Sequence, residues 1–340
     1  MLFVNKEMRM RLAILDDYQD AALSMADWSP LEPRVEIVVF NDTIADIDAL
    51  AERLGGFDIL CLMRERTPIT RALLDRLPNL KFIFTSGMRN KSIDLEACAE
   101  RAIPVTGSPT LDNPTAELTL GLMLALARQI PREDRLLHAG GWAAGVGIGL
   151  KGSTLAIFGL GRMGLQVARL AQAFGMRIVA WSANLTAERC AEAGVELAAS
   201  KEAMLREADF LSVHVMLGDR TRGAIGAAEF SIMKPGAYLI NTARAEIVDK
   251  AALVDALKRG RIAGAALDVF DIEPLPVDDP LRSLDRAILS PHAGYVVEQN
   301  YRLFYESAVH NIGKWLDGEV VNQLSATTGP KSHPAIAPAI

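Results

Sequence analysis

The chain has 340 residues, of which half are apolar and 23% are charged. This length allows two domains of ordinary size, and the composition is typical of a folded globular protein, which excludes a disordered chain. The formal charge is -6 and no long run of like charges occurs, so neither a nucleic acid nor an anionic membrane is expected as a partner.

The cysteines and the N-terminus indicate the cellular compartment in which the protein is expected. Cys61, Cys98 and Cys190 lie far apart and form no C-x-x-C pair, so we expect buried thiols in a reducing compartment and no metal site. The N-terminus lacks the pattern of a signal peptide, and the most apolar segment, 118–127, is about half as long as a membrane span. The sequence therefore predicts a cytoplasmic protein without a membrane partner.

In the first part of the chain, short β-rich runs alternate with helical patterns. The predicted strands are 11–15, 35–40, 57–63, 81–85 and 104–106, and the predicted helices are 21–27, 46–54, 70–77 and 94–101. Pro114, behind Asn113, opens a longer predicted helix that runs to about Ala139. The glycine-rich, aperiodic segment 140–150 is predicted to be a loop.

A second alternating series follows the loop. The predicted strands are 154–158, 177–181, 210–215, 237–241, 262–267 and 287–290, and the predicted helices are 162–175, 185–193, 249–259 and 298–316. Residues 325–340 are predicted to be loose. This alternation is typical of an α/β protein with two doubly wound parallel-sheet domains, which bind ligands at the carboxyl ends of their strands.

The segment TLAIFGLGRMGLQVARLAQAFG reads as a buried strand, a glycine turn and an amphipathic helix. In such a turn Gly159 allows the tight bend, Gly161 lets the backbone approach a pyrophosphate, and Gly164 lets the helix pack on the strand. With Arg162 and Met163 these glycines form the start of the helix, whose N–H groups favour phosphate. The sequence therefore predicts a site for NAD or NADP.

The choice between the two cofactors depends on the end of the next strand. An acidic residue there would hold the adenosine ribose, but the position is taken by Ser182. A neutral residue does not repel a 2′-phosphate, and no arginine follows directly to bind one. Ser182 could also merely end the strand, so NAD and NADP both stay open.

Four polar residues follow predicted strands in the second half of the chain. Arg244 in INTAR and Asp268 in DVFDIEP each lie just beyond a strand, Glu273 lies on the loop after Asp268, and His292 in SPHAG follows the last strand. Each alone is more often a surface or structural residue. Because the carboxyl ends of parallel strands meet at one edge of a sheet, together they predict a catalytic site there.

Over residues 10 to 324 the chain resembles the D-isomer-specific 2-hydroxyacid dehydrogenases, through GLGRMG, KPGAYLINTARAEIVDKAALVDALKRGRIAGAALDVFDIEP and SPHAG. The resemblance implies a flavodoxin-like substrate domain, residues 1–108 and 296–328, with an inserted Rossmann cofactor domain, residues 109–295. Residues 329–340 would be a loose tail. The implied reaction transfers a hydride between NAD(P) and C2 of a D-2-hydroxy acid or 2-keto acid.

The resemblance also implies roles for the polar residues. Arg244 would bind the substrate carboxylate and the oxygen on C2 by a forked contact. His292 would exchange the hydroxyl proton, and Glu273 would orient its imidazole and favour the protonated form. No metal is implied, because the arginine and the imidazolium supply the positive charge.

Further positions are implied to contact the ligands. Toward the cofactor they are Asp268, which would meet the nicotinamide carboxamide, and Thr115, Thr242 and Ala243. Toward the substrate they are Arg64, Gly87, Met88 and Arg89. Arg89 stands where the family commonly has glycine, which leads to the hypothesis that it adds a cation for a larger anionic substrate.

The family implies a homodimer formed through the cofactor domain, to which the apolar helix around 118–127 could contribute. A different class of function stays open, a dinucleotide-sensing module without turnover, as in the family's corepressor relatives. Formate dehydrogenase is disfavoured because the histidine's partner there is a glutamine, where this chain has Glu273. The identity of the 2-hydroxy acid is not predicted.

Overall fold

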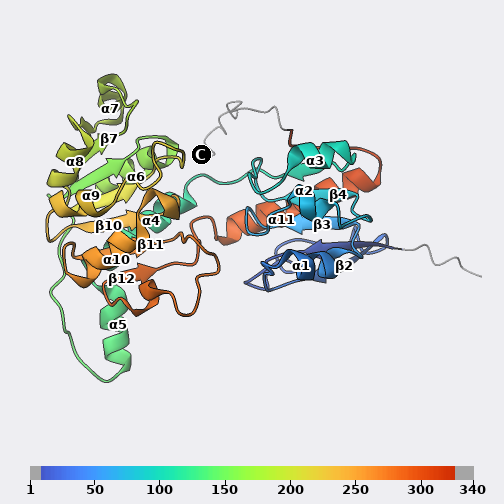
Figure 1. Cartoon of the computed structure of the whole chain (residues 1–340), viewed down its shortest axis with the longest axis horizontal. Helices are drawn as coiled ribbons and strands as arrows, with labels where there is room; N and C mark the ends of the chain where they lie inside the picture. The colour runs from blue at the N-terminus through green and yellow to red at the C-terminus, as the bar shows by residue number, and fades with distance from the viewer. Residues whose placement is uncertain (1–8, 326–340) are drawn as a thin grey trace, which may run out of the picture. The chain divides into compact units, whose positions relative to one another are not determined.

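The structure is a computed structural model that describes residues 9–325. Within this range the chain forms two compact units (Figure 1). Unit 1 consists of the residues up to Leu111 together with those from Val297 onward, and unit 2 consists of Asp112–Val296. The predicted loose tail, 329–340, lies outside the described residues. No helix within 9–325 is long and apolar enough to cross a membrane.

Unit 1 is built on a parallel sheet with the strand order β2-β1-β3-β4-β5, which is the flavodoxin-like order. Its strands are β1 Met10–Ile14, β2 Val35–Val39, β3 Ile59–Leu62, β4 Phe82–Thr85 and β5 Val105–Gly107. The helices between them are α1 Ile47–Leu54, α2 Arg71–Leu74 and α3 Leu95–Glu100. The strand interiors of β3, β4 and β5 are fully buried, as expected for parallel strands covered on two faces.

The last helix of the chain, α11 Glu298–Leu316, completes unit 1 and packs against β4 and β5. Aromatic contacts hold it there: Trp315 lies 4.9 Å from Phe82 between ring centroids, and Tyr305 lies 6.1 Å from Trp28. Tyr305 is buried, so the helix contributes to the apolar interior of a unit whose strands come from the other end of the chain.

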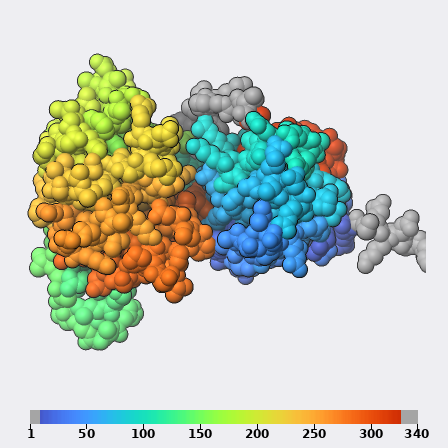
Figure 2. Space-filling model, viewed as in Figure 1, coloured from blue at the N-terminus to red at the C-terminus, as the bar shows by residue number. Residues whose placement is uncertain are grey.

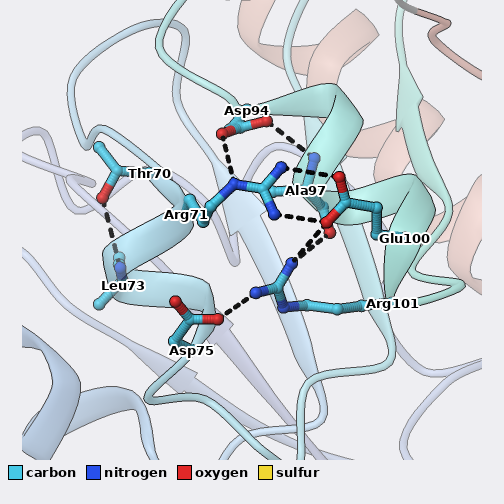
Figure 3. A network of polar contacts seen from close by, with 8 residues as sticks. All are labelled: Thr70, Arg71, Leu73, Asp75, Asp94, Ala97, Glu100 and Arg101. Carbon is cyan, nitrogen blue, oxygen red and sulfur yellow. Dashed lines mark hydrogen bonds and ion pairs between the residues drawn. The ribbon is translucent and has the colours of Figure 1, made fainter.

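Ion pairs connect α2 with α3 on the surface of unit 1 (Figure 3). Arg71 binds the two carboxylate oxygens of Glu100 and lies 3.8 Å from Asp94, and Arg101 pairs with Asp75. A forked guanidinium–carboxylate contact fixes geometry better than a single ion pair does. The network therefore ties together two helices that are too short to be stable alone.

Unit 2 is built on a seven-stranded parallel sheet in the order β12-β11-β10-β9-β6-β7-β8, which is the doubly wound Rossmann order with one added strand. Its strands are β6 Thr154–Phe158, β7 Arg177–Trp181, β8 Glu196–Leu197, β9 Phe210–Val213, β10 Tyr238–Asn241, β11 Gly264–Leu267 and β12 Ala287–Leu289. The strand order reverses between β6 and β9, and a crevice for ligands is expected at that point. These two sheets confirm the predicted fold class.

Helices cover the two faces of this sheet. They are α4 Pro114–Ala127, α5 Ile130–His138, α6 Arg162–Ala173, α7 Ala187–Ala193, α8 Lys201–Glu207, α9 Ala227–Ile232 and α10 Lys250–Lys258, with short 3-10 turns at Ala245–Ile247 and Pro280–Ser283. Side chains of β6 alternate between two apolar clusters, because successive residues of a strand point to opposite faces. Leu155 and Ile157 pack with α4 and α6, whereas Ala156 and Phe158 pack with α8, α9 and α10.

The prediction of one long helix from Pro114 to about Ala139 is wrong. The segment forms two helices, α4 and α5, which are separated at Gln129. Gln129 adopts a left-handed conformation with φ 53°, and Pro131 follows it without an N–H to donate. The carbonyl of Ala127 instead accepts a hydrogen bond from Ile148 of the loop 140–150, which has no helix or strand, as predicted.

The predicted helix 21–27 is also wrong, since these residues form turns. The carboxylate of Asp17 accepts hydrogen bonds from the N–H groups of Ala21 and Ala22, at 3.1 and 2.8 Å, and so competes with helical hydrogen bonds. In unit 2, three short elements lack a predicted counterpart, namely β8, α8 and α9.

Helix α5 projects from the rest of unit 2 as an arm (Figure 2, green). None of its residues is buried, and Ile130 and Leu137 are each about half exposed, at 53% and 52%. Beside it lies a hollow of about 1180 Å³ that is lined by residues of α4, α5 and β12. Unit 2 therefore exposes two large apolar side chains on this arm, next to a hollow of mixed polar and apolar lining.

Candidate active site

The glycine turn between β6 and α6 lies at the point where the strand order of unit 2 reverses. Gly159 has φ 103°, and a Cβ there would approach the backbone N of Val215 to 2.8 Å. A Cβ on Gly164 would overlap the carbonyl of Gly159, so this glycine permits the contact between helix and strand. The first and third glycines are thus required by the fold itself.

Gly161 differs from the other two glycines, because a Cβ there would meet open space. It is the N-cap of α6 and has no side chain to accept the first N–H groups of the helix, which include those of Arg162 and Met163. An anion would satisfy these donors and the helix dipole. The turn therefore fits the pyrophosphate of a dinucleotide, as the sequence predicts.

Ser182 directly follows β7, next to β6 in the sheet. The carbonyl of Trp181 accepts a hydrogen bond from the N–H of Gly159 at 3.0 Å, which ties the end of β7 to the glycine turn. The side chain at 182 is a neutral hydroxyl, so no carboxylate stands at the strand end where one would exclude a 2′-phosphate.

Arg244 lies on a turn after β10, and Asn241 closes that turn. The amide nitrogen of Asn241 donates to the Arg244 carbonyl at 2.9 Å, and its amide oxygen accepts from the N–H of Ala243 at 3.0 Å. The guanidinium of Arg244 is exposed and donates to the Ala243 carbonyl at 2.7 Å. A fixed backbone thus carries an exposed cation at the strand edge.

His292 and Glu273 form a hydrogen-bonded pair, with 2.7 Å between Nδ1 and Oε2. Their side chains are 36% and 33% exposed. Burial alone would raise the pKa of Glu273, but the hydrogen bond and charge of His292, the N–H of Phe270 and the charge of Arg244 together lower it. Glu273 is therefore a carboxylate at neutral pH, and Nε2 is the ring nitrogen left to face a ligand.

Asp268 holds the loop on which His292 lies. This buried carboxylate accepts hydrogen bonds from Ser290 Oγ at 2.5 Å and from the N–H groups of Ala293 and Gly294 at 2.7 and 2.9 Å. Burial raises the pKa of Asp268 although these hydrogen bonds oppose the shift. The residues on both sides of His292 are thus fixed to one side chain at the end of β11.

Three threonines connect α4 with this edge of the sheet. Thr115 Oγ1 donates to the Gly294 carbonyl at 2.9 Å, and Thr119 Oγ1 donates to the Thr115 carbonyl at 2.7 Å. Thr119 also lies 2.8 Å from Thr242 Oγ1, with both hydroxyls buried. The helix start therefore contacts the His292 loop and the Arg244 turn.

Unit 1 carries the remaining predicted residues at the carboxyl ends of β3 and β4. Arg64 has φ 55°, and its N–H donates to Ser86 Oγ at 2.8 Å, while its guanidinium donates to the Ser86 carbonyl at 3.3 Å. Gly87 has φ 91° and donates to Ser108 Oγ at 2.9 Å. Met88 packs against the core of unit 1, and Arg89 is exposed.

The structure thus collects the predicted residues in two groups. Unit 2 brings together the glycine turn, Arg244, Asp268, Glu273 and His292 with the threonines, and unit 1 brings together the loop residues near Arg64 and Gly87. Sequence reasoning missed Asn241, Thr119 and Ser290, which act through their hydrogen bonds. An asparagine at a strand end before a turn is a signal that would have indicated Asn241.

Comparisons with known proteins agree with this arrangement. Residues 120–294 match the family model described as D-isomer specific 2-hydroxyacid dehydrogenase, NAD binding domain. A glyoxylate reductase from Thermococcus litoralis is 38% identical over 315 residues, which cover 88% of this chain and 94% of that protein. A D-3-phosphoglycerate dehydrogenase from Methanocaldococcus jannaschii is 39% identical over 82% of this chain, but the match spans only 53% of that relative.

Among solved structures, a phosphoglycerate oxidoreductase from Vibrio cholerae O395 is 37% identical and superimposes with a TM-score of 0.85. The superposition covers 91% of this chain and 99% of that one. The D-lactate dehydrogenase of Escherichia coli, at 24% identity and a TM-score of 0.77, has the same fold.

Proposed function

The chain belongs to the D-isomer-specific 2-hydroxyacid dehydrogenase family, and we propose that it transfers a hydride between NAD(P) and C2 of a D-2-hydroxy acid or 2-keto acid. The observation that carries this proposal is the His292–Glu273 pair on the same sheet edge as the glycine turn and Arg244. A positioned imidazole with a carboxylate partner is the arrangement of a general acid–base catalyst.

His292 exchanges the proton in this reaction. In reduction, protonated His292 donates from Nε2 to the oxygen on C2, and in oxidation Nε2 accepts the hydroxyl proton. Glu273 accepts the hydrogen bond from Nδ1, which fixes the ring and stabilises the imidazolium. When bound, the nicotinamide supplies or accepts the hydride.

Arg244 binds the substrate carboxylate and polarises the C2 oxygen. Its planar guanidinium can donate two parallel hydrogen bonds to a carboxylate, which a lysine cannot do. The positive charges of Arg244 and protonated His292 stabilise the negative charge that develops on the C2 oxygen. The cation pair thus supplies the electrophilic assistance in reduction.

We assign the dinucleotide to residues of unit 2. We expect residues of unit 1 to contribute contacts to the substrate. The glycine turn with Arg162, Met163 and Ser182 would hold the dinucleotide, and Thr115, Thr242, Ala243 and Asp268 would lie along it toward the nicotinamide. Backbone N–H groups near Gly87 and Met88, together with Arg64, would contact the substrate, and exposed Arg89 would favour a second anionic group. Because Ser182 is neutral and no arginine directly follows it, the cofactor is NAD or NADP.

We further infer a cytoplasmic homodimer that forms through the cofactor unit. The arm α5 carries the half-exposed Ile130 and Leu137 and borders the 1180 Å³ hollow, which offers a second copy both an apolar ridge and a recess. Exposed apolar surface of this kind is typical of protein interfaces.

The test is a panel of 2-keto acids, including glyoxylate and hydroxypyruvate, assayed with NADH and with NADPH by the loss of absorbance. Turnover with at least one pair is expected. His292→Ala should abolish turnover while the affinity for NAD(P)H, measured by fluorescence, stays within about twofold, because the ring holds no phosphate. His310→Ala, which removes an exposed histidine of α11, is the matched control.

Retained turnover in His292→Ala would contradict the assignment of the acid–base group. Binding of NADH without turnover on any keto acid would instead favour the dinucleotide-sensing module, which no observation on this chain presently supports.

A further inference from the structure

Asn241 is the last residue of β10 and is 1% exposed. Its side chain spans the turn that leads to Arg244, since Nδ2 donates to the Arg244 carbonyl and Oδ1 accepts from the Ala243 N–H. The two partners require one donor and one acceptor from the same short side chain. Asparagine supplies the donor and the acceptor from two separate atoms, whereas aspartate lacks the donor when ionised.

The backbone of Asn241 also joins the Arg244 turn to the other half of the site. Its carbonyl accepts a hydrogen bond from the N–H of Asp268 at 3.0 Å. Asp268 in turn fixes Ala293 and Gly294, the neighbours of His292. A continuous set of hydrogen bonds therefore runs from the Arg244 turn to the His292 loop.

Side chains do not pack completely against the turn that carries Arg244. A small, partly open pocket of about 20 Å³ adjoins it, lined by Asn241, Ala245, Val248 and Phe270 among others. That volume is about enough for one water molecule, so side chains leave some space next to the turn. The hydrogen bonds of the Asn241 side chain therefore restrain the Arg244 turn where apolar packing is incomplete.

We propose that Asn241 is a positioning residue for Arg244: its side-chain amide fixes the backbone at 243–244, and through it the guanidinium that binds the substrate carboxylate. This inference rests on the proposed role of Arg244. It predicts that loss of the amide weakens the binding of substrate much more than the binding of the dinucleotide, whose pyrophosphate lies on the glycine turn and not on the Arg244 turn. A displacement of about 1 Å at a reacting group lowers rates by up to about a hundredfold.

The experiment compares wild type, Asn241→Ala, Asn241→Asp, Arg244→Ala and the double variant Asn241→Ala/Arg244→Ala. The measurements are kcat and KM for the best 2-keto acid, the inhibition constant of oxamate, an unreactive carboxylate analogue, and the Kd of NADH. In Asn241→Ala, kcat/KM should fall about 10- to 100-fold and oxamate should bind at least about tenfold more weakly. The Kd of NADH should change much less than the inhibition constant of oxamate, because the glycine turn keeps its own contacts.

Asn241→Asp keeps an acceptor for the Ala243 N–H but loses the donor to the Arg244 carbonyl, so it should resemble Asn241→Ala. If Asn241 acts through Arg244, the double variant should have the same kcat/KM and oxamate affinity as Arg244→Ala alone. Lys201→Met is the control for a merely structural loss. Lys201 donates to the Ala224 carbonyl at 3.0 Å, and its variant should lower Tm without changing oxamate affinity.

Multiplicative losses in the double variant, or wild-type behaviour of Asn241→Asp, would overturn the proposal while leaving the proposed function intact. Unchanged turnover and oxamate affinity in Arg244→Ala would instead refute the role of Arg244 in the proposed function. The two failures are therefore distinguishable.

Discussion

His292 has φ 52°, a left-handed conformation that residues with a side chain seldom adopt. Such a conformation costs of order 1–3 kcal/mol and persists only where the surroundings determine it. Here the determining group is Asp268, which binds the N–H groups of Ala293 and Gly294 and the hydroxyl of Ser290. The orientation of the acid–base group therefore depends on a carboxylate that need not touch the substrate.

Asp268→Asn tests this dependence. The amide has one acceptor oxygen where the carboxylate has two, so a backbone N–H of the loop loses its partner, at a cost of about 1–3 kcal/mol in the free energy of unfolding. Turnover should fall with it, because His292 loses its support. Urea unfolding at pH 7 and the keto-acid assay check the two effects, and unchanged values in both would contradict the role of Asp268.

The difference in the free energy of unfolding between wild type and Asp268→Asn should also depend on pH. Burial raises the pKa of Asp268 in the folded state above the unfolded value of about 3.9. The folded state then binds the proton more tightly, so this group stabilises the fold at low pH, and that contribution is lost as pH rises through the folded pKa. The advantage of wild type over Asp268→Asn should therefore grow as pH falls from 7 toward 4. A gap that shrinks in that range would contradict the sign.

At the scale of elements, the three glycines of the turn should respond differently to alanine. Gly164→Ala places a Cβ onto the carbonyl of Gly159, so it should lower the free energy of unfolding by about 1–3 kcal/mol and disturb the turn. Gly161→Ala meets open space and should leave stability nearly unchanged while weakening NADH binding, since its Cβ lies where the pyrophosphate approaches. Thermal melts and fluorescence titration separate the two, and equal stability losses would contradict this division.

The glycine turn and the elements beside it were predicted closely. β6 and β7 match their predicted ranges, and α6 begins at the predicted residue, because buried strands and glycine punctuation act locally. The end of α4 was missed although Pro131 is a local signal that a continuous helix is interrupted there. The hydrogen bond that the carbonyl of Ala127 accepts from Ile148, a residue distant in the sequence, could not be seen in the sequence. The turns at 21–27 likewise depend on one side chain, Asp17.

In the candidate site, too, some residues could be predicted from the sequence and others could not. Arg244, Glu273 and His292 could be singled out because their residue types carry chemistry and each follows a strand. The supporting partners were not apparent, since Thr119 or Ser290 becomes significant only when folding brings its hydroxyl to Thr242 or Asp268. Two short helices, α8 and α9, which span 7 and 6 residues, were not predicted. Ser200, which caps α8, was an unused signal.

At the scale of the whole molecule, the arm α5 predicts the oligomeric state. Wild type should have the mass of a dimer by light scattering, and Ile130→Arg/Leu137→Arg should shift it toward monomer by placing charges in an apolar contact. Leu23→Arg is the matched control, because this leucine is 58% exposed but belongs to unit 1. A monomeric wild type, or a double variant that stays dimeric, would contradict an interface at α5.

The division of unit 1 into two stretches of the chain has a consequence for biosynthesis. A ribosome that has released residue 296 has made all of unit 2, whereas unit 1 still lacks α11 and its Tyr305 and Trp315. Domains fold as units during synthesis, so the cofactor-binding half can acquire its structure while the first five strands remain without their covering helix. Until then the nascent N-terminal strands expose apolar surface, and they are the part of the chain for which protection by a chaperone would matter most.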